Sequence, residues 1–199
     1  MLVACSKPVE VPEPAVAEPS RSVEGPTIAL SQIDTLMWHH PDSALSVMME
    51  FVTSPEAESL NEFEGHYCQV LVAELLFKND YGQSNREEVL KAVGYFDSID
   101  EGFLAARAHY INGVGYYERD SVVAACGEYL KALEMVETHF PGIETRHGTS
   151  LQPNHLPRFM ALTYGRLGDL FSGQFMQEPA IICRNLQLSA TRKPSFSTV

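Results

Sequence analysis

The chain has 199 residues, of which 45% are hydrophobic and 20% charged, and its formal net charge is -12. These values are ordinary for a single soluble domain with a sizeable core. They argue against direct nucleic-acid binding, because phosphate contacts need a clustered basic surface, and no apolar run is long enough to predict a membrane-spanning helix.

Residues 2–5 read Leu-Val-Ala-Cys, an order that resembles a bacterial lipobox. The resemblance implies that the chain is cleaved before Cys5 and that the Cys5 thiol is acylated, which would anchor the protein at the periplasmic or outer-membrane face of the cell envelope. Residues 6–26 are rich in Pro, Glu, Val, Ala and Ser, a composition that cannot bury enough surface to fold. We therefore predict a lipobox remnant and a disordered tether over residues 1–26. If the Leu-Val-Ala-Cys sequence is fortuitous, a cytoplasmic location is expected.

From residue 27 onward, apolar residues recur at helical spacing between Pro, Gly and polar turns. No alternating β-branched run of useful length occurs, so an all-α domain is predicted over residues 27–183. The expected helices cover residues 27–38, a segment that starts at Pro41, residues 60–77, 86–99, 103–118, 122–140 and 159–175, and a segment that starts at Pro179.

The most specific pattern lies in the helix pair from Ala106 to about Thr138. It places small and aromatic residues alternately at the spacing of a helical repeat: Gly113, Tyr116, Ala125, Tyr129 and Ala132. The Gly and the Ala residues allow two helices to approach closely, and the tyrosines fill the gap to the next pair. This pattern resembles the tetratricopeptide repeat, and the resemblance implies antiparallel helix pairs stacked as a right-handed solenoid.

A second copy of the pattern begins at Tyr164 and continues through Gly168 to Ala180. It then fails, because Arg184 and Gln187 stand where an aromatic and a small residue are expected. We therefore expect residues 184–199 to form an irregular tail, as a truncation or a frameshift would produce.

Two further segments, 34–44 and 108–113, are similar to a group of tetratricopeptide proteins of gut Bacteroides-type bacteria. Members of this group are often lipoproteins. Some longer relatives continue into a transmembrane helix and a DNA-binding domain, so that the repeats act as the sensory half of a transcriptional regulator.

The tetratricopeptide pattern implies a concave groove lined by the first helix of each pair. On that basis the residues predicted to contact a partner are Arg107, Tyr110, Val114, Tyr117 and Asp169, with Leu162 and Gly165 beside the last of these and Tyr67, Val70, Glu74 and Phe77 on the earlier helix. Aromatic and Arg side chains are frequent anchors of protein interfaces. The alternative, left open by the sequence, is that some of them pack against the neighbouring repeat.

Candidate catalytic and metal-binding patterns are weak. Cys68, Cys126 and Cys183 are widely spaced and the histidines lack ligand spacing, so no metal site and no cofactor are expected. Gly113-Val114-Gly115 lacks the third Gly and the preceding strand of a dinucleotide-binding motif. The sequence thus favours a non-catalytic module that binds a protein or peptide partner in the cell envelope, with the sensory half of a membrane-bound regulator as the alternative. A hydrolase in an unfamiliar helical fold is the least favoured.

Overall fold

The structure is a computed structural model that describes residues 28–82, 86–141, 155–174 and 177–191. Within these ranges the chain is all-helical, with eight α-helices, one short 3-10 turn (η1, Ala57–Ser59) and no strand, which confirms the predicted all-α class. The α-helices are α1 (Ile28–Met37), α2 (Pro41–Val52), α3 (Glu62–Lys78), α4 (Arg86–Ser98), α5 (Gly102–Tyr117), α6 (Val122–His139), α7 (Leu156–Gly173) and α8 (Gln177–Thr191).

Several helices begin at residues that the sequence marks clearly. Pro41 occupies the first turn of α2, where its missing N–H costs nothing. Asn61 caps α3: its side chain accepts a hydrogen bond from the Glu64 backbone N–H (2.9 Å), and the Glu64 carboxylate accepts one from the Asn61 backbone N–H (3.1 Å). This reciprocal capping box satisfies two backbone donors that a helix start leaves without partners.

Three helices end in the same way. Asp80, Asp100 and Asp120 follow α3, α4 and α5, and each has a positive φ of about 60° (61°, 57° and 57°). The residue after each aspartate donates its backbone N–H to a carbonyl five residues back, as in Tyr81 to Leu76 (3.0 Å). This is the Schellman geometry, and Asp is among the few non-Gly residues that adopt the left-handed conformation it needs.

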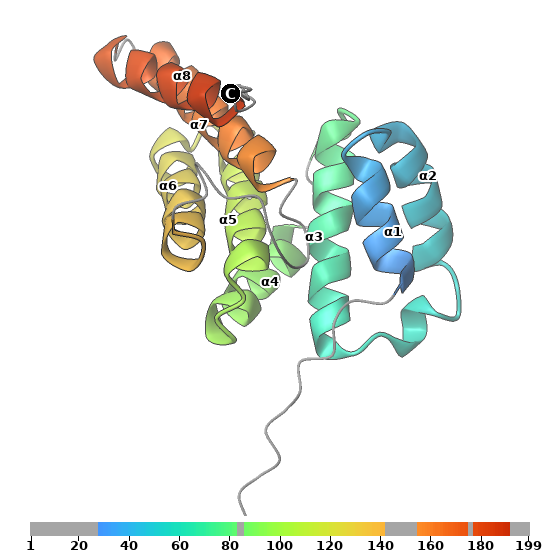
Figure 1. The fold of residues 1–199 in the computed structure, drawn as a ribbon. Coiled ribbons are helices and arrows are strands. Elements are labelled where there is room, and N and C mark those ends of the chain that lie inside the picture. Colours follow the sequence, from blue (N-terminus) through green and yellow to red (C-terminus); the bar gives the residue numbers. More distant parts are fainter. Residues whose placement is uncertain (1–27, 83–85, 142–154, 175–176, 192–199) are drawn as a thin grey trace, which may run out of the picture.

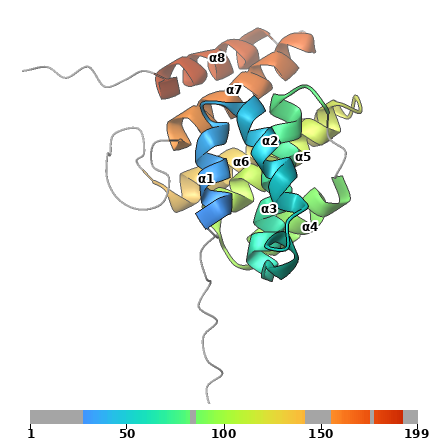
Figure 2. The ribbon, with the colours of Figure 1, turned by 90° about the vertical axis from the view of Figure 1, so that its right-hand side faces the viewer.

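The helices pack in chain order, each against the one before it, and α3 also touches α1 and α5. Figure 1 shows α1, α2 and α3 together on one side and α5 to α8 on the other, with α7 and α8 crossing above α5 and α6. Figure 2, at right angles, shows α8 on the outside of this end, beyond α7.

Helices α5 and α6 cross closely. A Cβ added to Gly113 would lie 2.7 Å from the Tyr129 ring and 3.3 Å from the Ala125 carbonyl oxygen, so only Gly fits there. Ala125, Tyr129 and Ala132 are all buried on α6, while Tyr116 is half-buried. Gly168 on α7 is likewise close to Ala180 and Cys183 of α8. The small residues thus lie where helices meet.

The C-terminal segment differs from its prediction. Residues 184–191 continue α8, while 192–199 lie outside the described residues. The residues after Arg184 have sufficient helix propensity to extend α8, although the apolar stripe of this helix fails there. The failure of the stripe is visible as exposure, since Leu186 is 37% and Leu188 66% exposed.

Cys5 and the tether predicted over residues 1–26 also lie outside the described residues. Among the helices that are described, none is long and apolar enough to cross a membrane.

Candidate functional site

A fully buried arginine joins three helices at the centre of the molecule. Arg107 of α5 donates two hydrogen bonds to the Asp34 carboxylate of α1 (2.8 and 2.9 Å) and two to the Glu74 carboxylate of α3 (3.0 and 2.6 Å). The Tyr67 hydroxyl donates a fifth bond to Asp34 (2.5 Å). The planar guanidinium is suited to this role, because it presents its donors as two forks that match carboxylates.

The charges of this cluster stabilise one another against the cost of burial. Burial alone raises the pKa of Asp34, but the charge and hydrogen bonds of Arg107, together with the Tyr67 hydrogen bond, hold it below its ordinary value. Burial lowers the pKa of Arg107, yet Asp34 and Glu74 raise it well above its usual range. Two carboxylates thus share one guanidinium.

A cavity of about 460 Å³ lies next to this cluster, within the range of small-ligand sites. We call it the central cavity. It is bounded by residues of α3, α5 and α7 and by one residue each from the turns that follow α1 and α3: Trp38, Glu74, Phe77, Lys78, Asp80, Tyr110, Phe159, Leu162 and Arg166. Aromatic and aliphatic side chains share the wall with four charged groups.

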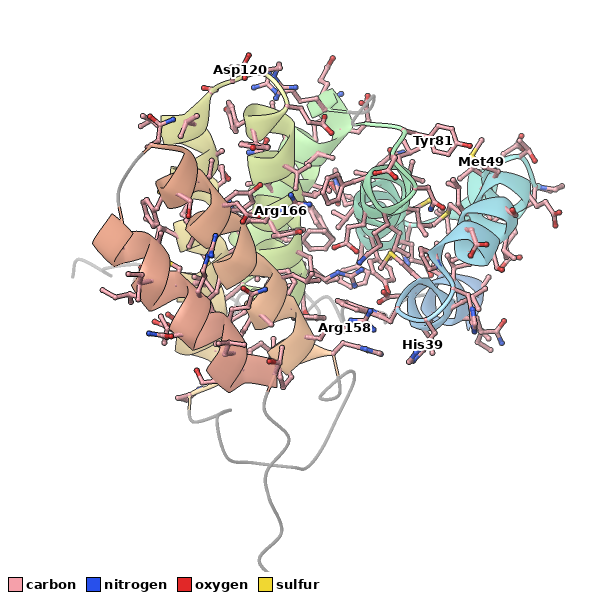
Figure 3. All side chains as sticks on the ribbon, turned by 90° about the horizontal axis from the view of Figure 1, so that it is seen from above. His39, Met49, Tyr81, Asp120, Arg158 and Arg166 are labelled. Atoms are coloured by element: carbon pink, nitrogen blue, oxygen red, sulfur yellow. The ribbon has the colours of Figure 1, made fainter. Side chains whose placement is uncertain are left out.

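Two cations, Lys78 and Arg166, line the central cavity together with the carboxylates of Glu74 and Asp80. The Lys78 ammonium lies 4.9 Å from the centre of the Trp38 ring, and the Arg166 guanidinium lies 4.7 Å from that of Phe77. Arg158 lies 5.6 Å from the Trp38 ring and donates a hydrogen bond to the Trp38 carbonyl (2.6 Å). Figure 3 shows Arg158 and Arg166 on α7, on the side that faces α1 and α3.

The pKa values of two of these groups reflect their surroundings. Burial lowers the pKa of Lys78, and the nearby Arg107 and Arg158 charges lower it further, against the opposite pull of Glu74. Burial also lowers the pKa of Arg166, but the Tyr110 hydroxyl, to which it is hydrogen-bonded, raises it overall. Burial thus opposes the charge of Lys78, whereas the Tyr110 hydroxyl favours that of Arg166.

Trp38 forms one end of the cavity. One neighbour of its ring is the imidazole of His155, stacked with ring centres 4.7 Å apart and planes 8° from parallel. The side chain is 3% exposed, and its indole N–H has no hydrogen-bond partner among the described residues. A buried N–H without a partner costs free energy.

The structure changes the roles expected for several predicted partner contacts. Arg107 is 0% exposed and Val114 1%, so neither is available to a partner: Arg107 is enclosed by its two carboxylates, and Val114 by neighbouring helices. Tyr110 is 6% exposed and forms part of the cavity wall. Tyr117 (45% exposed) and Asp169 are on the surface but do not line the cavity.

Three residues from the wider predicted groove do line the cavity, namely Glu74, Phe77 and Leu162. Sequence reasoning did not identify Trp38, Lys78 or Arg166. The sequence could have indicated Lys78 as a lining residue, because it follows Glu74 by four residues and so lies on the same face of α3. Arg166 could have been indicated in the same way, because it lies on the same helix as Leu162. No pattern of neighbouring residues predicts that Asp34 of α1 contacts Arg107 of α5.

A second buried polar cluster, centred on His109, lies away from the central cavity and holds helices together. His109, buried on α5, lies between Glu128 (2.7 Å) and Asp97 (3.2 Å) and so links α4, α5 and α6. An open depression of about 610 Å³ runs along α1, but its lining includes no Lys, Arg, Asp or Glu side chain. In the described part of the chain, no group of His, Cys, Asp or Glu side chains is placed to hold a metal ion.

Comparisons with known proteins add no assignment: no family model, no curated protein and no solved structure matches the chain.

Proposed function

We propose that the helices form antiparallel pairs stacked as a right-handed solenoid of the tetratricopeptide type. The packing of each helix on its predecessor and the contact of Gly113 with Ala125 and Tyr129 support this arrangement. The three Schellman ends at Asp80, Asp100 and Asp120 recur at a spacing of 20 residues, as repeated helix ends would. In this arrangement the central cavity belongs to the concave face.

On this fold we propose a non-catalytic interaction module, in which the central cavity takes a peptide or helix of another protein. The observation that supports this most is the cavity itself, which combines aromatic and aliphatic walls with a few charged groups. We further propose that Cys5 carries a lipid and that the module acts at the cell envelope, as in the Bacteroides-type tetratricopeptide lipoproteins that the sequence resembles. Leu162, which is 37% exposed on the cavity rim, is then a direct partner contact.

A selection from a random peptide library tests this function. The full chain is immobilised and peptides are enriched over several rounds, with counter-selection against a Leu162→Arg variant, whose long charged side chain would fill the cavity. We expect peptides that bind the wild-type chain and lose at least about tenfold in affinity, or 1.4 kcal/mol, on the variant.

The matched control is Leu130→Arg, because Leu130 is exposed (52%) on α6 and does not line the cavity. Peptides should bind this variant as they bind the wild type, and both variants should show the wild-type helical content by circular dichroism. Failure to enrich any peptide that distinguishes the two variants would refute the proposed function.

A further inference from the structure

We propose that this chain assembles head to tail, with an exposed apolar face of α8 in one copy packed on the depression along α1 of a second copy. The contact repeats, between molecules, the way in which successive helices pack within one molecule. The central cavity and its proposed peptide take no part in it, so this inference goes beyond the proposed function and is tested separately.

The first argument is the outer face of α8, the last helix that the structure describes. We call it the α8 face, and it consists of four large aliphatic side chains with substantial exposure: Ile181 (57%), Ile182 (59%), Leu186 (37%) and Leu188 (66%). The opposite side of the helix, with Ala180 and Cys183, packs against Gly168 of α7. A helical repeat needs a polar outer face where a stack ends in water, and the α8 face is instead apolar.

The second argument is the surface of α1, the first described helix. The open depression of about 610 Å³ follows this helix from Ile28 through Ser31 and Thr35 to His39. Its lining lies on the side of α1 away from the buried residues of that helix, and Ile28 itself is 78% exposed. Helices pack by fitting the side chains of one into the grooves of another, and a depression that runs along a helix suits such a neighbour.

The third argument is charge. Two copies with a net charge of -12 repel each other, so a contact between them is favoured where few charges meet. No Lys, Arg, Asp or Glu lines the depression along α1. Within residues 179–191 the only such residue is Arg184, which is directed back to α7, where it donates a hydrogen bond to Ser172 (3.4 Å). By contrast, α4 and α6 carry exposed charges such as Lys91 and Glu134.

The fourth argument is the order in which the helices pack. Helix α2 packs on α3, α4 on α5 and α6 on α7, so three even-numbered helices each cover the odd-numbered helix that follows. Among the described helices, α8 has no helix after it and α1 has none before it. Figures 1 and 3 show α1 and α8 on opposite sides of the molecule, so one copy does not bring them together. A second copy supplies each with the missing neighbour.

The form of the assembly follows from the two surfaces. Because the α8 face and the depression along α1 differ, the contact is heterologous, and every dimer retains one free surface of each kind. Assembly therefore continues beyond the dimer as concentration rises, unless a ring closes. One helix packed on another gives a small interface, so we expect each contact to be weak, with a Kd in the micromolar range.

Analytical ultracentrifugation of the full chain tests the assembly, over concentrations from about 1 μM to about 500 μM. We expect the weight-average mass to rise with concentration above the 22.1 kDa of one chain. Added salt should strengthen association, because it screens the repulsion between acidic copies. A mass that stays at one chain over the whole range, or association that salt weakens, would overturn the proposal.

Two blocked variants identify the surfaces. Ile182→Glu places a carboxylate on the α8 face, and Thr35→Glu places one in the depression along α1; both residues are exposed, so both variants should keep the wild-type helical content. Each variant alone should associate at least about tenfold more weakly than the wild type, because the contact would bury an unpaired charge. Leu130→Glu, at an equally exposed leucine of α6 (52%), is the matched control and should assemble as the wild type does.

An equimolar mixture of the two blocked variants is the decisive sample. The α8 face of Thr35→Glu can still meet the intact depression of Ile182→Glu, whereas both remaining surfaces of that pair are blocked. The mixture should therefore form a dimer with wild-type affinity and no larger species.

Every other pattern contradicts head-to-tail assembly. If Thr35→Glu alone still dimerises, two α8 faces pair with each other; if Ile182→Glu alone does, two copies of α1 pair. A mixture that stays monomeric, or a Leu130→Glu variant that assembles as poorly as the blocked ones, would also refute the contact. Neither Thr35 nor Ile182 lines the central cavity, so all these results leave the proposed peptide site untouched.

Discussion

Removing the Arg107 guanidinium is the sharpest perturbation of this fold. Arg107→Met keeps a side chain of similar length but leaves the Asp34 and Glu74 carboxylates buried without their counter-charge. Breaking a buried ion pair on one side costs about 3–5 kcal/mol. For a chain of this size each kcal/mol lowers Tm by about 2–4 °C, so we expect a loss of roughly 6–20 °C.

The pH dependence distinguishes this mechanism from simple loss of packing. In the wild type the pKa of Asp34 is held below its ordinary value of 3.8, so its contribution is present above that pH and is lost only as pH falls through the lower folded value. In Arg107→Met burial is opposed only by the Tyr67 hydrogen bond and the His155 charge, and burial, the largest influence, raises the carboxyl pKa. The cost then falls as the carboxyls take up protons, and the gap between variant and wild type should narrow from pH 7 to pH 4.5.

Thermal and urea unfolding followed by circular dichroism at both pH values measure these effects. Arg119→Met, at an exposed turn, is the matched control and should change the free energy of unfolding by less than about 0.5 kcal/mol. Combining Arg107→Met with Asp34→Asn and Glu74→Gln removes the uncompensated charge and should recover part of the loss. A deficit in Arg107→Met that is below about 1 kcal/mol, or that is the same at both pH values, would refute the reasoning.

Three further outcomes are expected. Gly113→Ala forces its methyl group into the Tyr129 ring and should destabilise the fold by about 1–3 kcal/mol, whereas Gly127→Ala, with nothing within 4 Å, should stabilise it by about 0.5–1 kcal/mol; unfolding in urea measures both. Asp120→Gly relieves a positive φ of 57° and should raise Tm, whereas Asp120→Val should lower it. Burial raises the pKa of Cys68 to about 11, so its reaction with a thiol reagent at pH 8 should be slow until urea unfolds the chain.

The helices were predictable because their signals are local. Pro41 at the start of one helix and the Asn61–Glu64 capping box at the start of another act within a single turn. The Gly113 crossing was predictable too, since a small residue facing Ala125 follows from the repeat pattern. These features depend on residues that are close in sequence, and one sequence is enough to reveal them.

The site was only partly predictable because it depends on distant pairings. Arg107 had the pattern of an outward residue on α5, but helices cover α5 on all sides and its partner Asp34 is 73 residues away. Glu74 and Leu162 were placed in the groove by the repeat pattern, whereas Trp38 joins it only because the end of α1 packs near α7. The register of distant helices is set by packing in three dimensions.

The long separation between Asp34 and Arg107 also matters while the chain is being made. Synthesis proceeds at about 5–20 residues per second, so Asp34 leaves the ribosome roughly 4–15 s before the arginine that will neutralise it. During that interval the first helices cannot close over the Asp34 carboxylate without paying for an unpaired charge. The nascent N-terminal half should therefore stay open to solvent until the fifth helix emerges.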